Sequence, residues 1–408
     1  MSGVQARNLK KTHGDTCNTC DSLKLKIEVT EGPLKREHEV ELERHQRKAD
    51  LAYAVKREMK AKAISNKKMR VLVFDLEQCL PTPMLTCKQI YYSRQLYVYN
   101  LTIYDATTKI TYCYMWHEGQ GAKGGNQFAS CILRHILEEV PSDVEDIVLF
   151  SDTCSGQNRN SHVAAMYFVA LQEHPSIQTI QHIFLVPGHT HLEVDNKHSV
   201  IERKKRQNER ISVPEEWYDL VKEAGMTDPK NFPEGKFKVI RMEQEFFDFA
   251  ALLKDPLIKR EKLMNGQKMS YLDSHWFAYK KKQIGIVEVK SALNPHALFE
   301  KLSFLRSGYR CDSLPRISDL LNKCYTGPYP ISPKKKKDLL ELLEFLEPQH
   351  HQFYLTLITD DSITDDVHPG VPEQADEERI QEAVANVLES VILAVRENDP
   401  EADDDIEL

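Results

Sequence analysis

The chain has 408 residues, of which 41% are hydrophobic and 28% are charged. That length allows two or three domains with sizeable cores. It contains no run of 18 apolar residues and no signal-peptide pattern, so we expect an intracellular protein without a membrane-spanning segment. Nine cysteines at irregular spacing argue against a disulfide framework.

The net charge of -8 is unevenly distributed. Residues 360–408 hold seventeen Asp and Glu against two Arg, a charge of -15, which leaves +7 on the rest of the chain. A basic body with an acidic tail is compatible with a polyanionic partner. A solvated surface with a solubilising tail explains the same distribution.

Residues 1–34 show little hydrophobic periodicity and contain the pair Cys17-x-x-Cys20. Such a pair is half of a zinc site. His38 and His45 could add nitrogen ligands in the spacing C-x2-C-x17-H-x6-H, which is not that of a standard zinc finger. The alternative is that the missing ligands lie upstream of Met1.

Residues 35–68 are predicted to form a long, exposed helix, because residues 35–65 contain no Gly or Pro and few apolar positions. Between Lys35 and Arg70 there are twelve Lys and Arg and six Asp and Glu. The excess of positive charge would suit contact with a nucleic-acid backbone. A solvated helix with internal salt bridges is the competing interpretation.

From Met69 to Val213 the pattern changes to strands alternating with helices. We predict a hairpin that turns at 105–108 and the element order β-β-β-α-β-α-β-α. This order favours an α/β fold with a mixed sheet covered by helices. The segments are 69–78, 95–118 (the hairpin), 128–140, 146–153, 162–174, 180–188 and 195–209.

Two further regions follow. Residues 214–358 give weaker signals, from which we predict a smaller α+β region. Residues 359–408 are predicted to be mostly disordered. One amphipathic helix within them could bind a protein partner or pack back onto the chain. Its apolar stripe consists of Ile380, Val384, Val387, Leu388, Val391 and Val395.

Carboxylates stand at the ends of two predicted strands. Asp75 follows the apolar run 71–74, and Asp152 follows the run 147–150. Buried carboxylates need partners or a metal ion, and Mg²⁺ or Mn²⁺ prefers oxygen ligands. A third acid should come from the last predicted helix, where Asp195, His198 and Glu202 share one face. Asp195 could equally act as an N-cap.

These acids lie within recognisable motifs: FDLEQCLPTP at 74–83, SDTCSGQNRN at 151–160, GHTHLEVD at 188–195 and IERKKR at 201–206. From about Met69 to Arg210 the chain resembles the ribonuclease H-like fold of DDE/D-type transposases and integrases. It is more similar still to an uncharacterised, transposon-derived domain of insect, cnidarian and other animal proteins. DTCNTCDSL and HQRKA, which contains His45, extend that resemblance to residues 13–213.

The resemblance implies a metal-dependent DNA nuclease or strand-transfer protein of the nucleus. Asp75 and Asp152 would hold two Mg²⁺ or Mn²⁺ ions about 4 Å apart, and Asp195, or Glu202 in its place, would complete the site. Self-association is a further expectation that the resemblance carries. A domesticated protein that binds nucleic acid or another protein without catalysis is the alternative function.

Substrate contacts are predicted at two basic or amide-rich segments. Gln157, Asn158 and Arg159 would approach phosphates, although the segment from Gln157 to Asn160 also suits a turn and helix cap. The run from Arg203 through Lys204 and Lys205 to Arg206 would bind the DNA backbone; a solvated helix face or a nuclear-import signal explains it equally.

His189 and His191 are predicted to orient the acids or contact substrate. Their GHTH segment also resembles one segment of calcineurin-like metallophosphoesterases. The other metal-binding segments of those enzymes do not occur here in order.

Overall fold

The computed structural model describes residues 17–154, 156, 158–226, 236–259, 262–271 and 273–363. The chain divides into two units, 1–359 and 360–408, and all but four of the described residues belong to the first. The amphipathic helix predicted at 380–395 lies outside the described residues. Among the helices that are described, none combines the length and the apolar character that crossing a membrane requires.

The centre of the first unit is a mixed sheet, in which ten strands are described. Its order is β10-β9-β8-β6-β5-β1-β3-β4-β7, and the short β2 pairs with β3. β1 is antiparallel to β3 but parallel to β5, which is parallel to β6. The strands are β1 (Met69–Leu76), β2 (Leu80–Thr82), β3 (Leu96–Asp105), β4 (Thr111–His117), β5 (Asp146–Ser151), β6 (Thr179–Phe184), β7 (Phe237–Arg241), β8 (Trp276–Lys280), β9 (Ile286–Lys290) and β10 (Glu300–Ser303).

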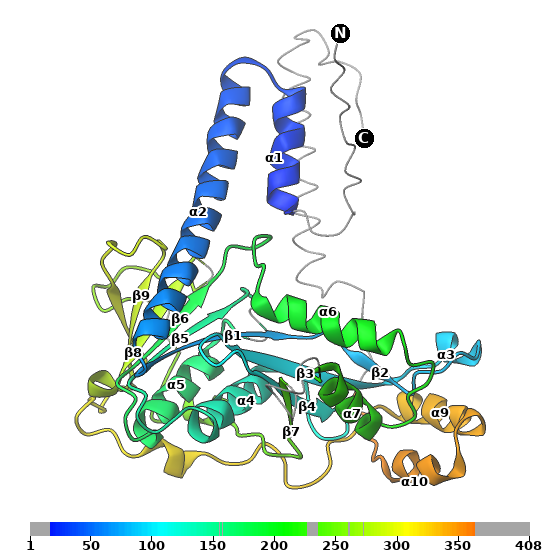
Figure 1. Ribbon diagram of the computed structural model, residues 1–408. Coiled ribbons are helices and arrows are strands. Elements are labelled where there is room, and N and C mark those ends of the chain that lie inside the picture. The colour runs from blue at the N-terminus through cyan, green and yellow to red at the C-terminus, as the bar shows by residue number, and fades with distance from the viewer. Residues whose placement is uncertain are drawn as a thin grey trace, which may run out of the picture. The chain divides into compact units, whose positions relative to one another are not determined.

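Helices cover both faces of this sheet, with α4 and α5 below it and α6 above it in Figure 1. α1 and α2 form an antiparallel hairpin that extends away from the sheet. The helices are α1 (Asn18–Val29), α2 (Gly32–Ser65), α3 (Gln89–Tyr92), α4 (Gly125–Glu138), α5 (Ser161–Glu173), α6 (Glu193–Lys205), α7 (Pro214–Ala224), α8 (Phe249–Leu252), α9 (Pro333–Glu341) and α10 (Pro348–Thr356), with 3₁₀ turns η1 (Lys281–Gln283), η2 (Ile317–Leu320) and η3 (Leu342–Phe345).

Strand alternation decides which side chains meet which helices. In β1, Leu72 and Phe74 join the core under α4 and α5, whereas Val71 and Val73 face the core that α2 and α6 cover. Side chains two residues apart on a strand share a face. The next residue of the second series is Asp75, so its position on the α6 side follows directly from the alternation.

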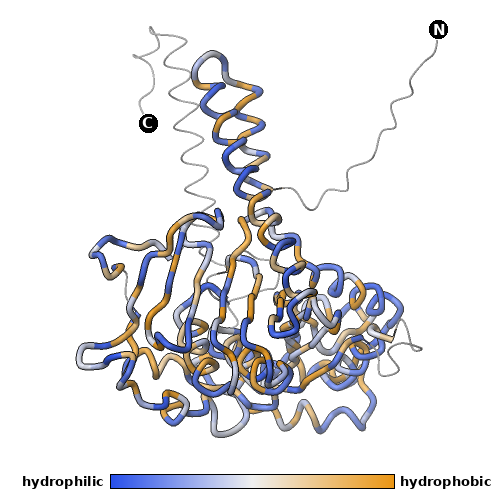
Figure 2. Tube along the Cα trace, turned by 60° about the vertical axis from the view of Figure 1, so that its left-hand side comes forward, coloured by the Kyte–Doolittle hydropathy of each residue, from blue (hydrophilic) through white to orange (hydrophobic). Residues whose placement is uncertain are grey.

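The predicted α/β class is confirmed, and the predicted element order occurs with β2 and α3 inserted after β1. The long helix expected from residue 35 is α2, which is preceded by a helix, α1, that we did not predict. Residues 214–358 were expected to form a smaller α+β region. The structure shows that their strands β7 and β8 extend the central sheet, since β7 pairs with β4 and β8 pairs with β6. Figure 2 shows apolar residues along much of the sheet and mixed hydropathy in the hairpin of α1 and α2.

Candidate metal centres

The first candidate site lies between the ends of β1 and β5 and the start of α6. β1 and β5 run parallel with Val73 beside Phe150, so the same register brings Asp75 beside Asp152. One oxygen of Asp75, one of Asp195 and a ring nitrogen of His198 all lie within 4.8 Å of one another. The structure therefore brings together acids that are separated by up to 120 residues in sequence.

The electrostatics of Asp75 reflect this crowding. Burial, the charge of Asp152 and, more weakly, the charge of Asp195 raise the pKa of Asp75 to about 8. The Leu76 amide, which donates to Asp75 Oδ1 at 2.8 Å, partly offsets the rise. A cation bound among the three carboxylates would remove the repulsion.

Asp152 and Asp195 are each held by backbone amides and neighbouring side chains. Asn158 Nδ2 donates to Asp152 Oδ1 at 2.6 Å. The amide of Leu192 donates to Asp195 Oδ2 at 2.8 Å. Asp195 is therefore the third residue of α6 and not the N-cap, which is Leu192. Its carboxylate still caps the helix N-terminus, so capping and a role in the site are compatible.

Two histidines accompany these acids. The exposed His191 lies with Nδ1 3.4 Å from Asp195 Oδ2. The Nε2 atom of His198 is shielded from solvent and has no hydrogen-bond partner in the described part of the chain. Burial lowers the pKa of His198 to about 4, so its imidazole is neutral at neutral pH and free to accept or to ligate.

A pocket of about 530 Å³ continues from the acids along α6. Glu77, two residues after Asp75 and just past the end of β1, lines it and is only 2% exposed. Burial raises the pKa of Glu77 to about 8, and its Oε1 has no partner among the described residues. The sequence analysis did not single out Glu77; its i, i+2 relation to Asp75 was the available signal.

The basic run 203–206 separates into two kinds of residue. Lys204 pairs with Glu223 at 2.9 Å, and Lys205 pairs with Glu202 at 3.1 Å. Arg203 and Arg206 are exposed and line the pocket together with Glu202. Glu202 is thus a pocket residue with a lysine partner, one helical turn beyond His198.

The loop after β5 differs from the expectation of phosphate contact. Asn158 and Arg159 are buried, and Arg159 donates to the carbonyl of Ser274 and lies over the ring of Phe184. Burial lowers the pKa of Arg159 to about 10. Gln157 lies outside the described residues. Asn160, in contrast, accepts the amides of His162 and Val163 and caps α5, as the turn-and-cap alternative predicted.

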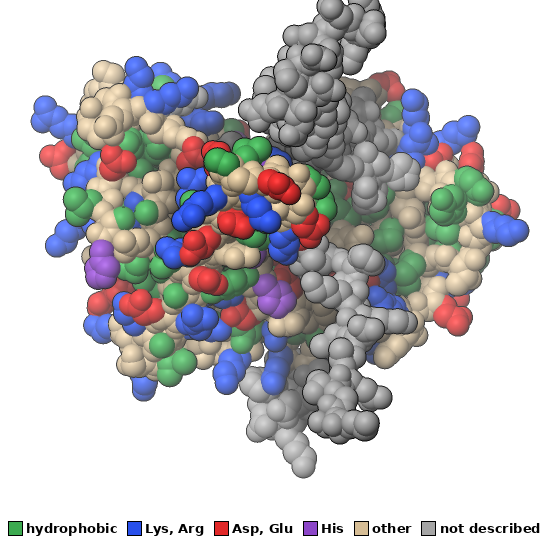
Figure 3. All heavy atoms as spheres, turned by 90° about the horizontal axis from the view of Figure 1, so that it is seen from above, with side chains coloured by type: hydrophobic (Ala, Val, Ile, Leu, Met, Phe, Trp, Pro, Cys, Tyr) green, Lys and Arg blue, Asp and Glu red, His purple; other side chains and the backbone are tan. Residues whose placement is uncertain are grey.

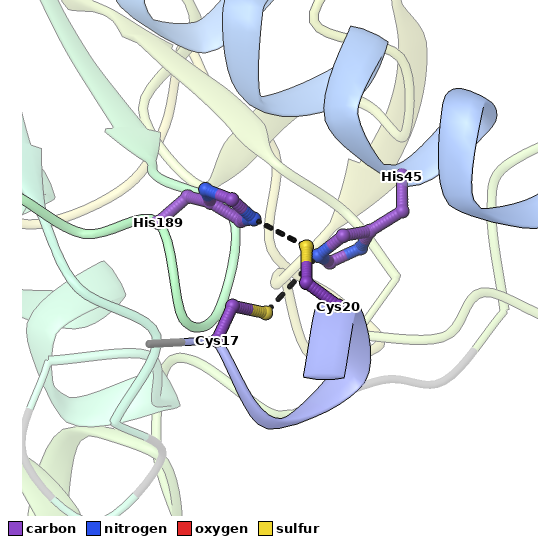
Figure 4. A group of neighbouring side chains, drawn as sticks. All are labelled: Cys17, Cys20, His45 and His189. Carbon is purple, nitrogen blue, oxygen red and sulfur yellow. Dashed lines mark hydrogen bonds between the residues drawn. The ribbon is translucent and has the colours of Figure 1, made fainter. Parts of the chain in front are cut away.

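The second candidate site joins the hairpin to the loop before α6 (Figure 4). Its residues are Cys17, Cys20, His45 and His189, whose ligand atoms all lie within 4.8 Å of one another. His38 does not belong to the group. Burial and the neighbouring Cys17 raise the pKa of the Cys20 thiol, while burial and His189 lower the pKa of His45.

His189 was predicted to orient the acids or contact substrate, and the structure places it with the thiols of Cys17 and Cys20. Its Nε2 lies 3.3 Å from Cys20 Sγ, and His45 Nε2 lies 3.2 Å from Cys17 Sγ. The two cysteines and His45 were predicted as ligands from sequence. The fourth member was missed because 169 residues separate it from Cys20.

Residues 100–291 match a family described as a domain of unknown function, DUF7869. The matched region runs from β3 to the residue after β9. It contains Asp152, Asp195 and His189, but neither Asp75 nor the two cysteines. No curated protein and no solved structure matches the chain. The similarity thus covers part of both candidate sites without assigning an activity to either.

Proposed function

We propose that this chain is a transposon-derived DNA nuclease or strand-transfer protein that depends on Mg²⁺ or Mn²⁺. The observation that carries the proposal is the convergence of Asp75, Asp152 and Asp195 where the carboxyl ends of β1 and β5 meet the start of α6. Three acids from separate segments, with one of them largely buried, are costly in a fold unless a cation or a proton balances them.

The topology supports a ribonuclease H-like arrangement. β1 lies at the centre of these five strands. On one side, β3 is antiparallel to both β1 and β4, and on the other side β5 and β6 are parallel to each other and to β1. In the transposases and integrases that the chain resembles, the acids come from the first strand, the end of the fourth strand and the start of the helix after the fifth strand. Here Asp75, Asp152 and Asp195 occupy the corresponding β1, β5 and α6, if the short β2 is set aside.

The residues fit a hard divalent cation, since carboxylate oxygens dominate the cluster. Asp75, Asp152 and Asp195 would hold it, with His198 as a further neighbour. When bound, such a cation activates water or a DNA 3′-hydroxyl and stabilises the leaving oxygen of a phosphodiester. The cluster that contains Cys17 and Cys20 has softer donors, and zinc is the metal that we propose for it.

The remaining residues would position the nucleic acid. Asn158 fixes the orientation of Asp152 through its 2.6 Å hydrogen bond. Arg203 and Arg206, exposed at the pocket, would contact phosphates. Seen from above, positive and negative side chains are interspersed on the visible surface (Figure 3), so DNA contact on this face would rest on such local groups.

The test is metal-dependent nicking of supercoiled plasmid by the purified chain, the Asp75→Asn variant and the Asp152→Asn variant. Asp50→Asn is the matched control, because Asp50 is exposed on α2. We expect nicking with Mg²⁺ or Mn²⁺ that both site variants lose and the control keeps. Nicking that survives in both site variants would refute the assignment. Absence of nicking by a folded chain that still binds DNA would favour a domesticated binding protein.

A further inference from the structure

We infer that Cys17, Cys20, His45 and His189 bind one zinc ion, and that this ion clamps the α1–α2 hairpin to the loop in front of α6. The donor set is two thiols and two imidazoles, a combination typical of structural zinc. No acid belongs to this group, which separates it from the carboxylate site.

The spacing of the donors fits one tetrahedral ion. With ligands about 2.0–2.3 Å from zinc, neighbouring donors in a tetrahedron lie roughly 3.5 Å apart. The two sulfur–nitrogen separations of 3.2 and 3.3 Å are close to that value, and every separation stays within 4.8 Å. Figure 4 shows the four side chains pointing toward a common centre. Four protein ligands leave no open position, so the site is structural and not catalytic.

The contacts of α1 indicate why such an ion is needed. Within α1 only Cys20 and Leu23 are buried, whereas Leu25 and Val29 are 63% and 79% exposed. One buried leucine provides little apolar burial to hold a helix of 12 residues in place. A metal bound by residues at the start of α1 would supply the missing stability, as it does in small zinc domains.

The packing at Gly188 is independent evidence that the loop is shaped around Cys17. Gly188 has a φ of +74°, and a Cβ atom on it would lie 2.5 Å from Cys17 Sγ. A residue with a side chain would therefore push the thiol out of the cluster and strain the backbone. The glycine permits the thiol to reach the loop that carries His189.

The same loop leads directly to Asp195, so the clamp acts on the carboxylate site. The Tyr53 hydroxyl donates to the carbonyl of His189 at 3.0 Å, and Lys56 Nζ donates to the carbonyl of His191 at 3.1 Å. Lys56 and Lys60 also pair with Glu193 at 3.2 and 2.7 Å. With zinc bound to His45 and His189, α2 holds both ends of the loop. This second part of the inference rests on the proposed function.

The first experiment measures zinc content and the visible spectrum after cobalt substitution, using the full chain. Cys20→Ser and His189→Ala are the site variants, and His38→Ala is the matched control on the same helix as His45. We expect one zinc per chain, a tetrahedral cobalt spectrum with thiolate bands, loss of both in the site variants and retention of both in the control. A chain supplied with zinc that binds none, or a His189→Ala variant that keeps full zinc content and the same spectrum, would overturn the site.

The clamp is tested by amide hydrogen exchange with and without zinc. Removal of zinc should speed exchange in residues 18–31 and 188–192 and leave the central strands unchanged. Equal exchange in the two forms would overturn the clamp.

Coupling between the zinc site and Asp195 is measured through Mn²⁺ binding at the carboxylate site. Free Mn²⁺ is followed by its electron paramagnetic resonance signal, so the measurement needs no enzymatic activity. We expect weaker Mn²⁺ binding by at least several-fold in His189→Ala. An unchanged Mn²⁺ affinity in that variant would overturn the coupling. Asp75→Asn should lose Mn²⁺ binding while it keeps zinc, so a failure of the nuclease proposal is distinguishable from a failure of the zinc site.

Discussion

Replacing Asp75 by Asn should stabilise the protein when no Mg²⁺ or Mn²⁺ is bound. Asn has nearly the same shape and can still accept the amide of Leu76, but it carries no charge beside Asp152 and Asp195. The substitution therefore removes the cost of burying an ionisable carboxyl group beside two other acids and leaves the packing in place. Clustered acids that bind a metal ion often lower the stability of the metal-free protein, because nothing balances their charges there.

The magnitude follows from the pKa of Asp75, which is raised from 3.8 to about 8. At pH 7 the unfolded chain ionises this group and the folded chain keeps it protonated, so folding loses at most about 4 kcal/mol. Partial solvent access lowers the loss, and we expect Asp75→Asn to gain about 1–2 kcal/mol. Because the pKa is raised in the fold, the gain should be absent near pH 4 and grow as the pH rises toward 8.

The assay is urea unfolding of wild type, Asp75→Asn and the control Asp50→Asn, each loaded with one equivalent of zinc. Excess Mn²⁺ should stabilise the wild type by about 3 kcal/mol at 100 times its dissociation constant and should leave Asp75→Asn unchanged. A gain that does not depend on pH would show that the ionisation of Asp75 is not its cause. Equal stabilisation of both proteins by Mn²⁺ would refute the role of Asp75 as a ligand.

Three further predictions concern other parts of the chain. Gly188→Ala should destabilise the fold by about 1–3 kcal/mol and reduce zinc content, because the added Cβ atom collides with Cys17. Denaturant unfolding measures the stability and metal analysis measures the zinc. A variant unchanged in both would contradict the packing argument. Arg206→Gln should weaken DNA binding and reduce the dependence of log affinity on log salt concentration by about 1. Lys204→Gln should change both quantities less, because Lys204 is already paired with Glu223. DNA-binding titrations at several salt concentrations measure both, and equal effects of the two variants would count against the assignment. Burial lowers the pKa of His135 to about 3, so the unfolded chain gains a proton first as the pH falls below about 6.5. This group should lower the free energy of unfolding by up to about 1.4 kcal/mol per pH unit, and a His135→Gln variant with the same pH profile as the wild type in urea titrations down to about pH 4 would exclude it.

The acids at strand ends could be predicted from sequence because their signals are local. An apolar run followed by Asp75 or Asp152 defines a strand and its end, and alternation fixes the face on which the carboxylate lies. The order of elements then limits which strand ends can meet. Asp195 could be proposed as the third acid because it lies at the start of the last predicted helix. The sequence could not determine that it is the third residue of that helix and not the N-cap.

Sequence also identified the cysteine pair and His45, yet it could not choose between His38 and His45 by spacing alone. Tertiary structure decided that choice, because only His45 lies at the position along α2 that the loop before α6 reaches. It likewise decided that His189 joins the thiols and that Arg159 turns inward to Ser274. Periodicity and spacing report contacts within one element, whereas these contacts depend on how separate elements pack, and that is set by the whole core.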